Sequence, residues 1–282
     1  MLHFLKRDLK KKVQSDALGK FNLQAIPIAL PLPFNPFDLP ILQAGYLMNT
    51  TVDMPQGSIN PSYVSGEWFE DTILKNTSLL LRRTSQTVTV LNNGFKCESI
   101  STETKINNPT IDLLNGQTNC SFMCAFKTTK NLAASYKILN MITDATESIF
   151  VLLGIKDVTG QLFLYESQYP NFIQKYSIND YGNNVFHVAI VNVNQDAKLI
   201  EVYTDLGEHI SGSNAAFLIK PFTSIDGLEF CLGARSSGGI NAAAYPALFG
   251  DYFFFNDLLT IGEINALMAY ESHRLGITYV SF

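Results

Sequence analysis

The sequence predicts an all-β protein, a sandwich or a barrel, that begins with an extended arm and ends with one α-helix. Many short apolar segments follow one another, separated by Gly, Asn, Asp, Ser and Pro. An apolar pattern with helical spacing and clear start and stop signals occupies the end of the chain. Prolines recur near its beginning, where they favour an extended backbone.

The first 60 residues differ from the rest. Prolines recur there, and because each fixes φ and removes a backbone donor, neither a helix nor a central strand is expected around them: Pro27, Pro31, Pro33, Pro36 and Pro40. Apolar residues fill the spaces between them, and an extended segment with so much apolar surface needs something to lie against. We therefore expect residues 1–60 to be an assembly arm that docks on another chain through Pro27, Leu30, Pro33, Phe34 and Phe37.

Composition limits the class of protein. Hydrophobic residues make up 46% of the chain and charged residues 16%, which favours a packed globule. The net charge of −5 argues against general nucleic-acid binding, although "LKRDLKKK" near the start concentrates positive charge at one tip. The longest apolar run, "AIPIALPLPF", is broken by proline and falls short of the ~20 residues of a spanning helix, so no membrane span is expected.

Strands are expected from about residue 61 onward. "QTVTVL" alternates with period two and is followed by the turn "NNG" and by "FKCESI", which predicts a hairpin. Asn115 and Gly116 turn the chain again, after which Phe122, Cys124 and Phe126 share one strand face. Further strands are expected within "SIFVLLGI", "QLFLYES", "VFHVAIVNVN", "KLIEVYTD", "LEFCLGA" and "DYFFF". Residues 61–282 are thus expected to form the β-domain.

One helix is expected within residues 256–277. Thr260 can cap its start while Glu263, three residues later, returns a hydrogen bond to the cap, the arrangement known as a capping box. Gly276 marks its end. A stripe of apolar residues at helical spacing should face the β-domain: Ile264, Leu267, Met268 and Leu275.

The last strand and this helix together resemble the C-terminal signature of concanavalin A-like lectin/glucanase domains, also called laminin-G-like, of the phage or bacterial type. The positions that match are Gly250, Asp251, Asn256, Leu259, Thr260, Glu263, Ile264, Tyr270, Arg274, Gly276 and Ile277. The resemblance covers about residues 61–282. It implies two stacked antiparallel sheets in jelly-roll order, with the helix packed at one end.

No catalytic residue is expected. Glucanases that share this fold carry a Glu-x-Asp-x-x-Glu strand, since retaining hydrolysis needs two carboxylates about 5 to 5.5 Å apart. Here Glu67, Glu70 and Asp71 have a different spacing and Glu229 stands alone. The chain also contains no Gly-x-Ser-x-Gly nucleophile elbow. The sequence therefore predicts a protein that is not an enzyme.

No cofactor or metal site is expected either. The four cysteines are scattered, and in an extended "CSFMCAF" the α-carbons of Cys120 and Cys124 would lie roughly 13 Å apart, too far to bridge, so buried free thiols are expected. His187 and His209 offer no zinc-ligand spacing with them. Calcium is common in the family that the chain resembles, but no spacing groups the loop aspartates that could bind it.

Sugar recognition uses aromatic faces together with amide and charged partners at loop tips. Five residues in predicted loops have this character and are the candidate glycan-binding residues: Tyr181, Asn183, Asn184, Arg235 and Tyr245.

The leading functional hypothesis is a non-enzymatic structural protein of a virus particle, a phage head decoration or a tail or fibre component, that assembles in the host cytoplasm. Residues 1–60 would anchor it to other virion proteins or to copies of itself, and the lectin-like domain would contact a host surface glycan. Two alternatives stay open. One is a free soluble carbohydrate-binding module, and the other is a concanavalin-like glycosidase.

Overall fold

The computed structural model describes residues 34–46, six short strands between residues 57 and 106, and most of residues 114–282. After residue 114, it leaves undescribed residues 115, 131–135, 144–148, 157, 169–170, 214–220, 226–227 and 233–246. The predicted arm residues Pro27, Leu30 and Pro33 lie outside the described residues. Within that description, no helix combines the length and apolar character that crossing a membrane requires.

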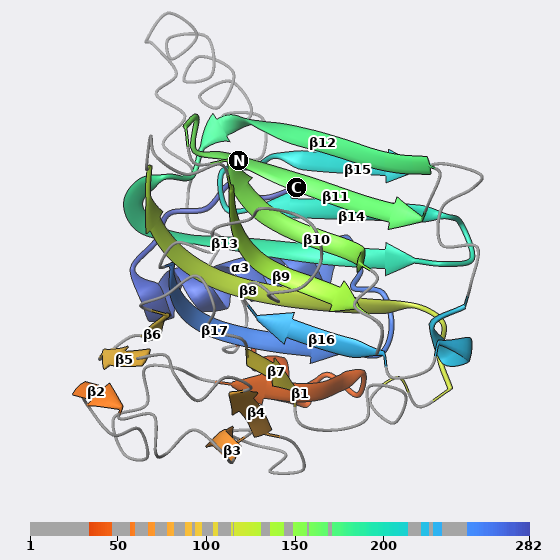
Figure 1. The fold of residues 1–282 in the computed structure, drawn as a ribbon, viewed down its shortest axis with the longest axis horizontal. Coiled ribbons are helices and arrows are strands. Elements are labelled where there is room, and N and C mark those ends of the chain that lie inside the picture. The colour runs from red at the N-terminus through yellow and green to blue at the C-terminus, as the bar shows by residue number, and fades with distance from the viewer. Residues whose placement is uncertain are drawn as a thin grey trace, which may run out of the picture. The chain divides into compact units, whose positions relative to one another are not determined.

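Two antiparallel sheets make up the described fold, which confirms the predicted all-β sandwich (Figure 1). Sheet A runs in the order β15 (His209–Ser213), β14 (Leu199–Thr204), β13 (Asn183–Asn194), β8 (Cys120–Thr129), β17 (Leu248–Phe255), β6 (Gly94–Cys97), β5 (Val88–Leu91) and β2 (Gly57–Ile59), and β1 (Leu42–Tyr46) also pairs with β17. Sheet B runs in the order β12 (Asn171–Asp180), β11 (Gln161–Gln168), β10 (Ile149–Lys156), β9 (Tyr136–Thr143), β16 (Glu229–Leu232), β7 (Thr104–Ile106), β4 (Ser78–Leu81) and β3 (Glu67–Glu70). The predicted hairpin is the pair β5 and β6, which turns between Leu91 and Gly94.

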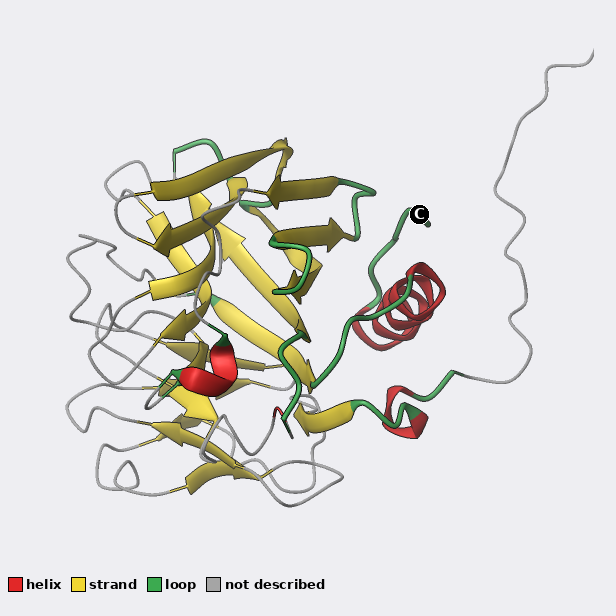
Figure 2. Cartoon of the chain, turned by 90° about the vertical axis from the view of Figure 1, so that its right-hand side faces the viewer, coloured by secondary structure: helices red, strands yellow, loops and turns green. Residues whose placement is uncertain are grey.

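Most of each central strand of sheet A (β8, β13 and β17) is buried on both faces, because a helix covers the face that sheet B does not. Residues on one face pack against sheet B in the larger core, among them Phe122, Phe126, Val191 and Phe254. Residues on the other face pack in a second core against helix α3 (Ile261–Leu275), among them Met123, Ile190 and Phe253. Figure 2 shows α3 beside the strands as a third layer. Neighbouring residues of one strand thus enter different cores, as the pleat requires.

Burial on both faces accounts for the sequence of the central strands. A strand with one wet face alternates apolar and polar residues, whereas a strand covered on both sides reads as a continuous apolar run. Every residue of β17 is buried, as are the first seven residues of β8. "DYFFF" and "CSFMCAF" are therefore apolar at odd and even positions alike.

Helix α3 begins and ends where the sequence predicts. The side chain of Thr260 accepts a hydrogen bond from the Glu263 N–H, and the Glu263 carboxylate accepts one from the Thr260 N–H, so the capping box is present. Gly276 ends the helix with a left-handed φ of 68°. The predicted stripe faces the second core, where Ile264, Leu267 and Met268 are buried and Leu275 is half-buried.

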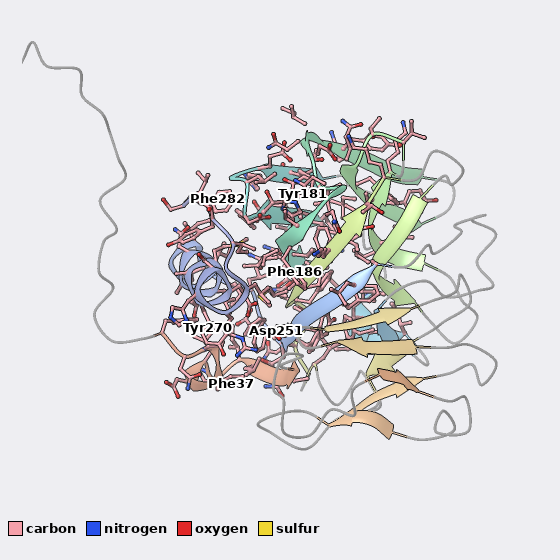
Figure 3. All side chains as sticks on the ribbon, turned by 90° about the vertical axis from the view of Figure 1, so that its left-hand side faces the viewer. Phe37, Tyr181, Phe186, Asp251, Tyr270 and Phe282 are labelled. Carbon is pink, nitrogen blue, oxygen red and sulfur yellow. The ribbon has the colours of Figure 1, made fainter. Side chains whose placement is uncertain are left out.

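An irregularity in β17 joins the sheet to this helix. The pairing of β17 with β8 shifts by one residue between Phe249 and Tyr252, a β-bulge that contains Gly250 and Asp251. The Asp251 carboxylate, which is 1% exposed, forms an ion pair with Arg274 in the last turn of α3, at 2.6 Å from its Nε. Figure 3 shows Asp251 and Tyr270 on the side of the sheet that carries α3. The Gly-Asp and Arg positions of the signature thus hold strand and helix together.

The polar side chains of Ser121 and Asn192 hold the loop between β17 and α3. The Asn192 Nδ2 donates to the Leu259 carbonyl at 2.8 Å, and the Ser121 hydroxyl donates to the Asp257 carbonyl at 2.8 Å. Ser121 Oγ also lies 2.6 Å from Asn192 Oδ1, so its single hydrogen is shared between the Asp257 carbonyl and this amide oxygen. Both are buried, so these bonds satisfy groups that would otherwise be costly in the second core.

Phe34 and Phe37, which the arm prediction assigns to docking on another chain, pack on the sandwich of their own chain. Both rings contact the second core, and the Phe37 ring meets the edge of Phe253 at 5.6 Å. Beyond the prolines, β1 pairs with the part of β17 that β6 leaves open. A proline-free stretch can add to a sheet in this way, and residues from Phe34 onward belong to the same compact unit as the sandwich.

Replacing Gly250 by Ala should destabilise the protein. The added Cβ would lie 3.0 Å from the Ala125 Cβ and 3.1 Å from a Phe186 ring carbon, both buried. We expect the free energy of unfolding, measured by urea titration, to fall by about 1–3 kcal/mol. Gly262→Ala is the control, because only Thr260 Oγ1 lies within 4 Å of its added Cβ, at 3.9 Å. It should leave the free energy unchanged or raise it by up to about 1 kcal/mol, and an equal loss in both variants would contradict this account.

Candidate binding site at the turn between β12 and β13

Three segments meet at one end of the sandwich. Tyr181, in the turn between β12 and β13, donates its N–H to the Gly160 carbonyl at 2.8 Å. Gly160 lies in the turn between β10 and β11. The Gly182 carbonyl, in the same turn as Tyr181, accepts the N–H of Lys130, which directly follows β8, at 3.2 Å. Gly160 has a φ of 72°, and a Cβ there would lie 1.9 Å from the Asp180 carboxylate, so only glycine fits this approach.

Asp180 fixes the shape of the turn. Its Oδ1 accepts the Gly182 N–H at 2.9 Å, and its Oδ2 forms an ion pair with Lys130. Burial acts to raise the pKa of Asp180, but the hydrogen bond and charge of Lys130 and the Gly182 N–H outweigh it and hold the pKa below its ordinary value. Both side chains are about two-fifths exposed. They are a charged pair that solvent and ligands can reach.

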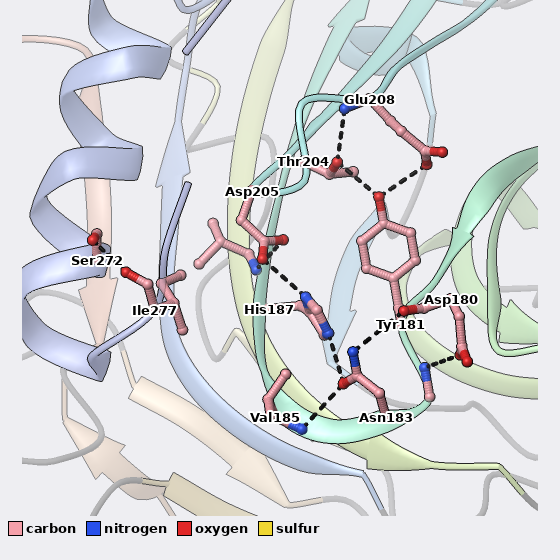
Figure 4. A network of polar contacts seen from close by, with 12 residues as sticks. Asp180, Tyr181, Asn183, Val185, His187, Thr204, Asp205, Glu208, Ser272 and Ile277 are labelled. Carbon is pink, nitrogen blue, oxygen red and sulfur yellow. Dashed lines mark hydrogen bonds and ion pairs between the residues drawn. The ribbon is translucent and has the colours of Figure 1, made fainter. Parts of the chain in front are cut away.

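Tyr181 was predicted as a glycan-binding residue in a loop, but the structure buries it completely. Its ring meets the edge of His187, and its hydroxyl is hydrogen-bonded to Thr204 at 2.8 Å and to Glu208 at 2.9 Å (Figure 4). Burial is the main reason that the pKa of Tyr181 is raised. Because the ring lies inside the core, it offers no face to a sugar and instead supports the turn from below.

Glu208 joins the edges of the two sheets. β12 carries an irregularity opposite β11, where Ser177 Oγ accepts the Leu162 N–H at 2.8 Å. This leaves the N–H groups of Ile178 and Asn179 pointing away from β11, and Glu208 Oε1 accepts both, at 2.8 and 2.7 Å. The bulge turns the Ile178 side chain outward, where it is 92% exposed.

His187 and Asp205 form a buried pair behind the turn. The Nδ1 atom of His187 lies 2.9 Å from Asp205 Oδ2, and its Nε2 atom lies 3.0 Å from Asn183 Oδ1. Asp205 Oδ1 also accepts the Val188 N–H at 3.2 Å. The same Asn183 oxygen accepts the Val185 N–H at 3.2 Å. Both ring nitrogens therefore meet oxygen atoms, so the ring is held from two sides and fixes the Asn183 amide (Figure 4).

The exposed surface above this network is the candidate site. A second irregularity lies at the start of β13, where pairing with β8 shifts between Asn183 and Phe186. Asn184 in this bulge has a left-handed φ of 66° and is exposed, as are Asn183 and Val185. Val158 and Thr159 of the neighbouring turn are exposed too. Polar side chains thus project from a backbone that buried hydrogen bonds hold in one conformation.

The predicted glycan residues therefore divide into three groups. Asn183 and Asn184 lie at the exposed site, although the Asn183 oxygen is engaged with His187 and Val185. Tyr181 lies beneath the site, and Arg235 and Tyr245 lie outside the described residues. Sequence reasoning missed the supporting residues Lys130, Asp180, Asp205 and Glu208. Asp180 ends β12 and the other three lie just outside strands, positions at which polar residues are ordinary turn formers, so the sequence contains no distinctive signal for them.

The described residues contain no group of three or more His, Cys, Asp or Glu side chains arranged to hold a metal ion. Cys120 and Cys124 are free and buried, as predicted. Burial raises the pKa of the Cys124 thiol to about 12 and that of Cys120 further still. Neither thiol is therefore a ready nucleophile or metal ligand.

No protein-family model and no curated protein sequence matches the chain. Solved structures do. Trypanosoma rangeli sialidase, in complex with 2,3-difluorosialic acid, superposes with a TM-score of 0.57 at 13% identity, over 80% of this chain and 33% of the sialidase. The receptor-binding domain of botulinum neurotoxin mosaic serotype C/D superposes with a TM-score of 0.52 at 16% identity, over 81% of this chain and 50% of the toxin domain.

The chain has a concanavalin A-like fold. The matching parts of both proteins are concanavalin A-like jelly-roll sandwiches, so the resemblance noted in the last strand and helix is confirmed at the level of the fold. The chain spans about a third of the sialidase and half of the toxin domain. Identities this low show a shared architecture and nothing more.

Removing the Glu208 side chain should loosen the candidate site. Glu208→Ala leaves the Ile178 and Asn179 N–H groups and the Tyr181 hydroxyl without their acceptor, and hydrogen bonds to a charged group contribute about 1.5–3 kcal/mol. We expect a loss of about 2–3 kcal/mol in urea titration and faster amide hydrogen exchange at residues 178 and 179.

The control is Glu201→Ala, whose carboxylate pairs with the half-exposed His209 and should contribute about 1 kcal/mol or less. If Glu208→Ala costs no more than this control, Glu208 does not join the two sheets as described.

Proposed function

We propose that the chain is a non-enzymatic, lectin-like module that binds a carbohydrate at the exposed turn between β12 and β13. The observation that carries the proposal is the pair of bulges on either side of this turn, one in β12 and one in β13. Bulges occur preferentially beside functional sites, where they redirect side chains. Here they place Ile178 and the Asn184 amide outward on a backbone that Glu208, Asp205 and His187 hold from beneath.

The chemistry of this surface suits sugar hydroxyls. The amide of Asn184 can donate and accept hydrogen bonds, the Asp180 carboxylate can accept them, and the Lys130 ammonium can donate them. Because Lys130 and Asp180 neutralise each other, the described part of the site favours a neutral sugar over a strongly charged one. The exposed Val158 and Val185 side chains add apolar contact area.

The comparisons support a binding role by analogy of fold. The Trypanosoma rangeli enzyme has been determined with sialic acid, and the toxin fragment is described as a receptor-binding domain. These descriptions concern those two proteins. We extend to this chain only the idea that a concanavalin A-like sandwich can present a ligand site, which fold alone does not prove.

The arrangement of sheet B supports a non-enzymatic role over glycoside hydrolysis. Glu67 lies on β3 and Glu229 on β16, and β7 and β4 lie between these strands. Strands three positions apart are separated by roughly 14 Å, whereas paired catalytic carboxylates lie about 5 to 9.5 Å apart. Product release from a polysaccharide panel that Glu67→Gln or Glu229→Gln abolishes would favour the glycosidase alternative.

The virion role stays a prediction from the sequence. We propose that residues before Phe34, with Pro27, Leu30 and Pro33, attach the sandwich to other virion proteins or to copies of itself. The chain would then be a laminin-G-like structural component, of the phage or bacterial type, that projects its sandwich toward host glycans. Phe34 and Phe37 belong to the compact unit of the sandwich, so the proposal rests on the residues before them.

Replacing Asn184 by Gly tests the site without disturbing the backbone. Glycine keeps the left-handed φ of 66° and removes only the amide side chain. On a glycan array followed by calorimetry with the best-bound glycan, we expect wild type to bind at millimolar or lower concentration. The variant should bind about two- to tenfold more weakly, since one lost hydrogen bond contributes about 0.5–1.5 kcal/mol.

Lys198→Gly is the matched control. Lys198 is the other described non-glycine residue with positive φ, at 55°, and it lies in the turn at the opposite end of β13. This variant should bind like wild type. Absence of any glycan binding by wild type would overturn the proposed function, and equal losses in both variants would place the site elsewhere.

A further inference from the structure

Helix α3 carries a buried carboxyl group for which the structure provides no hydrogen bond. Glu271 lies on the same stripe as Ile264, Leu267 and Met268, and its side chain is 0% exposed. Among the described residues, neither of its oxygens has a partner at hydrogen-bond geometry, and its polar neighbour is the Asp251 carboxyl group. An ionised carboxylate in such a place would cost several kcal/mol, whereas a protonated one avoids most of that cost.

The charged groups next to Glu271, namely Asp251 and Arg274, already form an ion pair with each other. The acidic neighbour is Asp251 on β17, and Asp251 is paired with Arg274, one turn after Glu271 on the helix. Tyr270 also belongs to this group, since its ring lies 5.7 Å from the Arg274 guanidinium. One arginine thus faces two buried carboxyl groups. It can neutralise only one of them, and Asp251 holds it at 2.6 Å.

We infer that Glu271 is protonated in the folded protein and that its protonation state controls the packing of α3 on sheet A. The helix packs firmly when Glu271 is neutral and less firmly when Glu271 ionises. Ionisation would place a second negative charge beside Asp251 inside the second core. The same core holds Phe253 between Phe37 and Tyr270, so a weakened α3 also weakens the packing of the segment that begins at Phe34.

The direction of the effect follows from proton linkage. Burial raises the pKa of Glu271 well above its ordinary value of 4.5, the Asp251 charge raises it further, and Arg274 opposes both. The folded state therefore keeps a proton that the unfolded state has released. The stabilising contribution of the proton is complete below about pH 4.5 and is lost as pH rises toward the folded-state pKa.

The test is the unfolding equilibrium of the full chain, measured by urea titration between pH 4.5 and 9. Glu271→Gln keeps the shape and removes the ionisation. We expect the unfolding constant of wild type, divided by that of Glu271→Gln, to rise with pH by up to about tenfold per pH unit. Asp257→Asn, which removes an exposed carboxyl between β17 and α3, should give a ratio that does not change with pH in this way.

A direct titration keeps the inference testable if Glu271→Gln does not fold. The carboxyl carbon resonance of Glu271 in wild type, followed by NMR, should change at a pH well above 4.5 or not at all before the protein unfolds. A midpoint near 4.5 would overturn the inference. So would a wild-type to Glu271→Gln ratio that does not vary with pH.

Discussion

Coverage of the central strands of sheet A on both faces is the constraint on which the rest of the described structure depends. An apolar outer face needs a third layer, and α3 together with the segment from Phe34 to Ile41 supplies it. The buried Ser121 and Asn192 position the loop that leads into the helix, and the Asp251–Arg274 pair holds its last turn. The C-terminal signature is thus a set of contacts that attach one helix to one sheet.

The same third layer reaches the candidate site. After α3 the chain runs back along sheet A, and the Val280 N–H donates to the Asp205 carbonyl at 2.9 Å. Phe282 meets the Tyr203 ring edge-on at 5.1 Å, and Asn265 binds the Phe282 backbone through both of its polar atoms. Asp205 in turn holds His187. The contacts that support the turn between β12 and β13 therefore include residues 280–282 as well as the strands.

Local signals predicted the parts of the fold that depend on local chemistry. The capping box of α3, the glycine at its end and the Asn-Gly hairpin were all readable, because each is set by a few adjacent residues. The strand β12 was not predicted, because "NFIQKYSIND" is interrupted by polar residues that the bulge and Glu208 accommodate from a distance. The burial of Tyr181 was not predicted either, because it too depends on residues distant in sequence. Its neighbours in sequence form a turn, but its partners Thr204 and Glu208 lie more than twenty residues away.

The most direct test of the central claim is the stability of the sandwich strands when α3 packs poorly. Leu267→Ala removes a fully buried side chain between the helix and sheet A, a change that typically costs 2–5 kcal/mol. If α3 is part of the core, the free energy of opening that hydrogen exchange measures at the slowest amides of β8 and β17 should fall by this full amount. If only the amides of α3 lose protection while those of β8 and β17 keep theirs, the helix is an accessory layer and the account is contradicted.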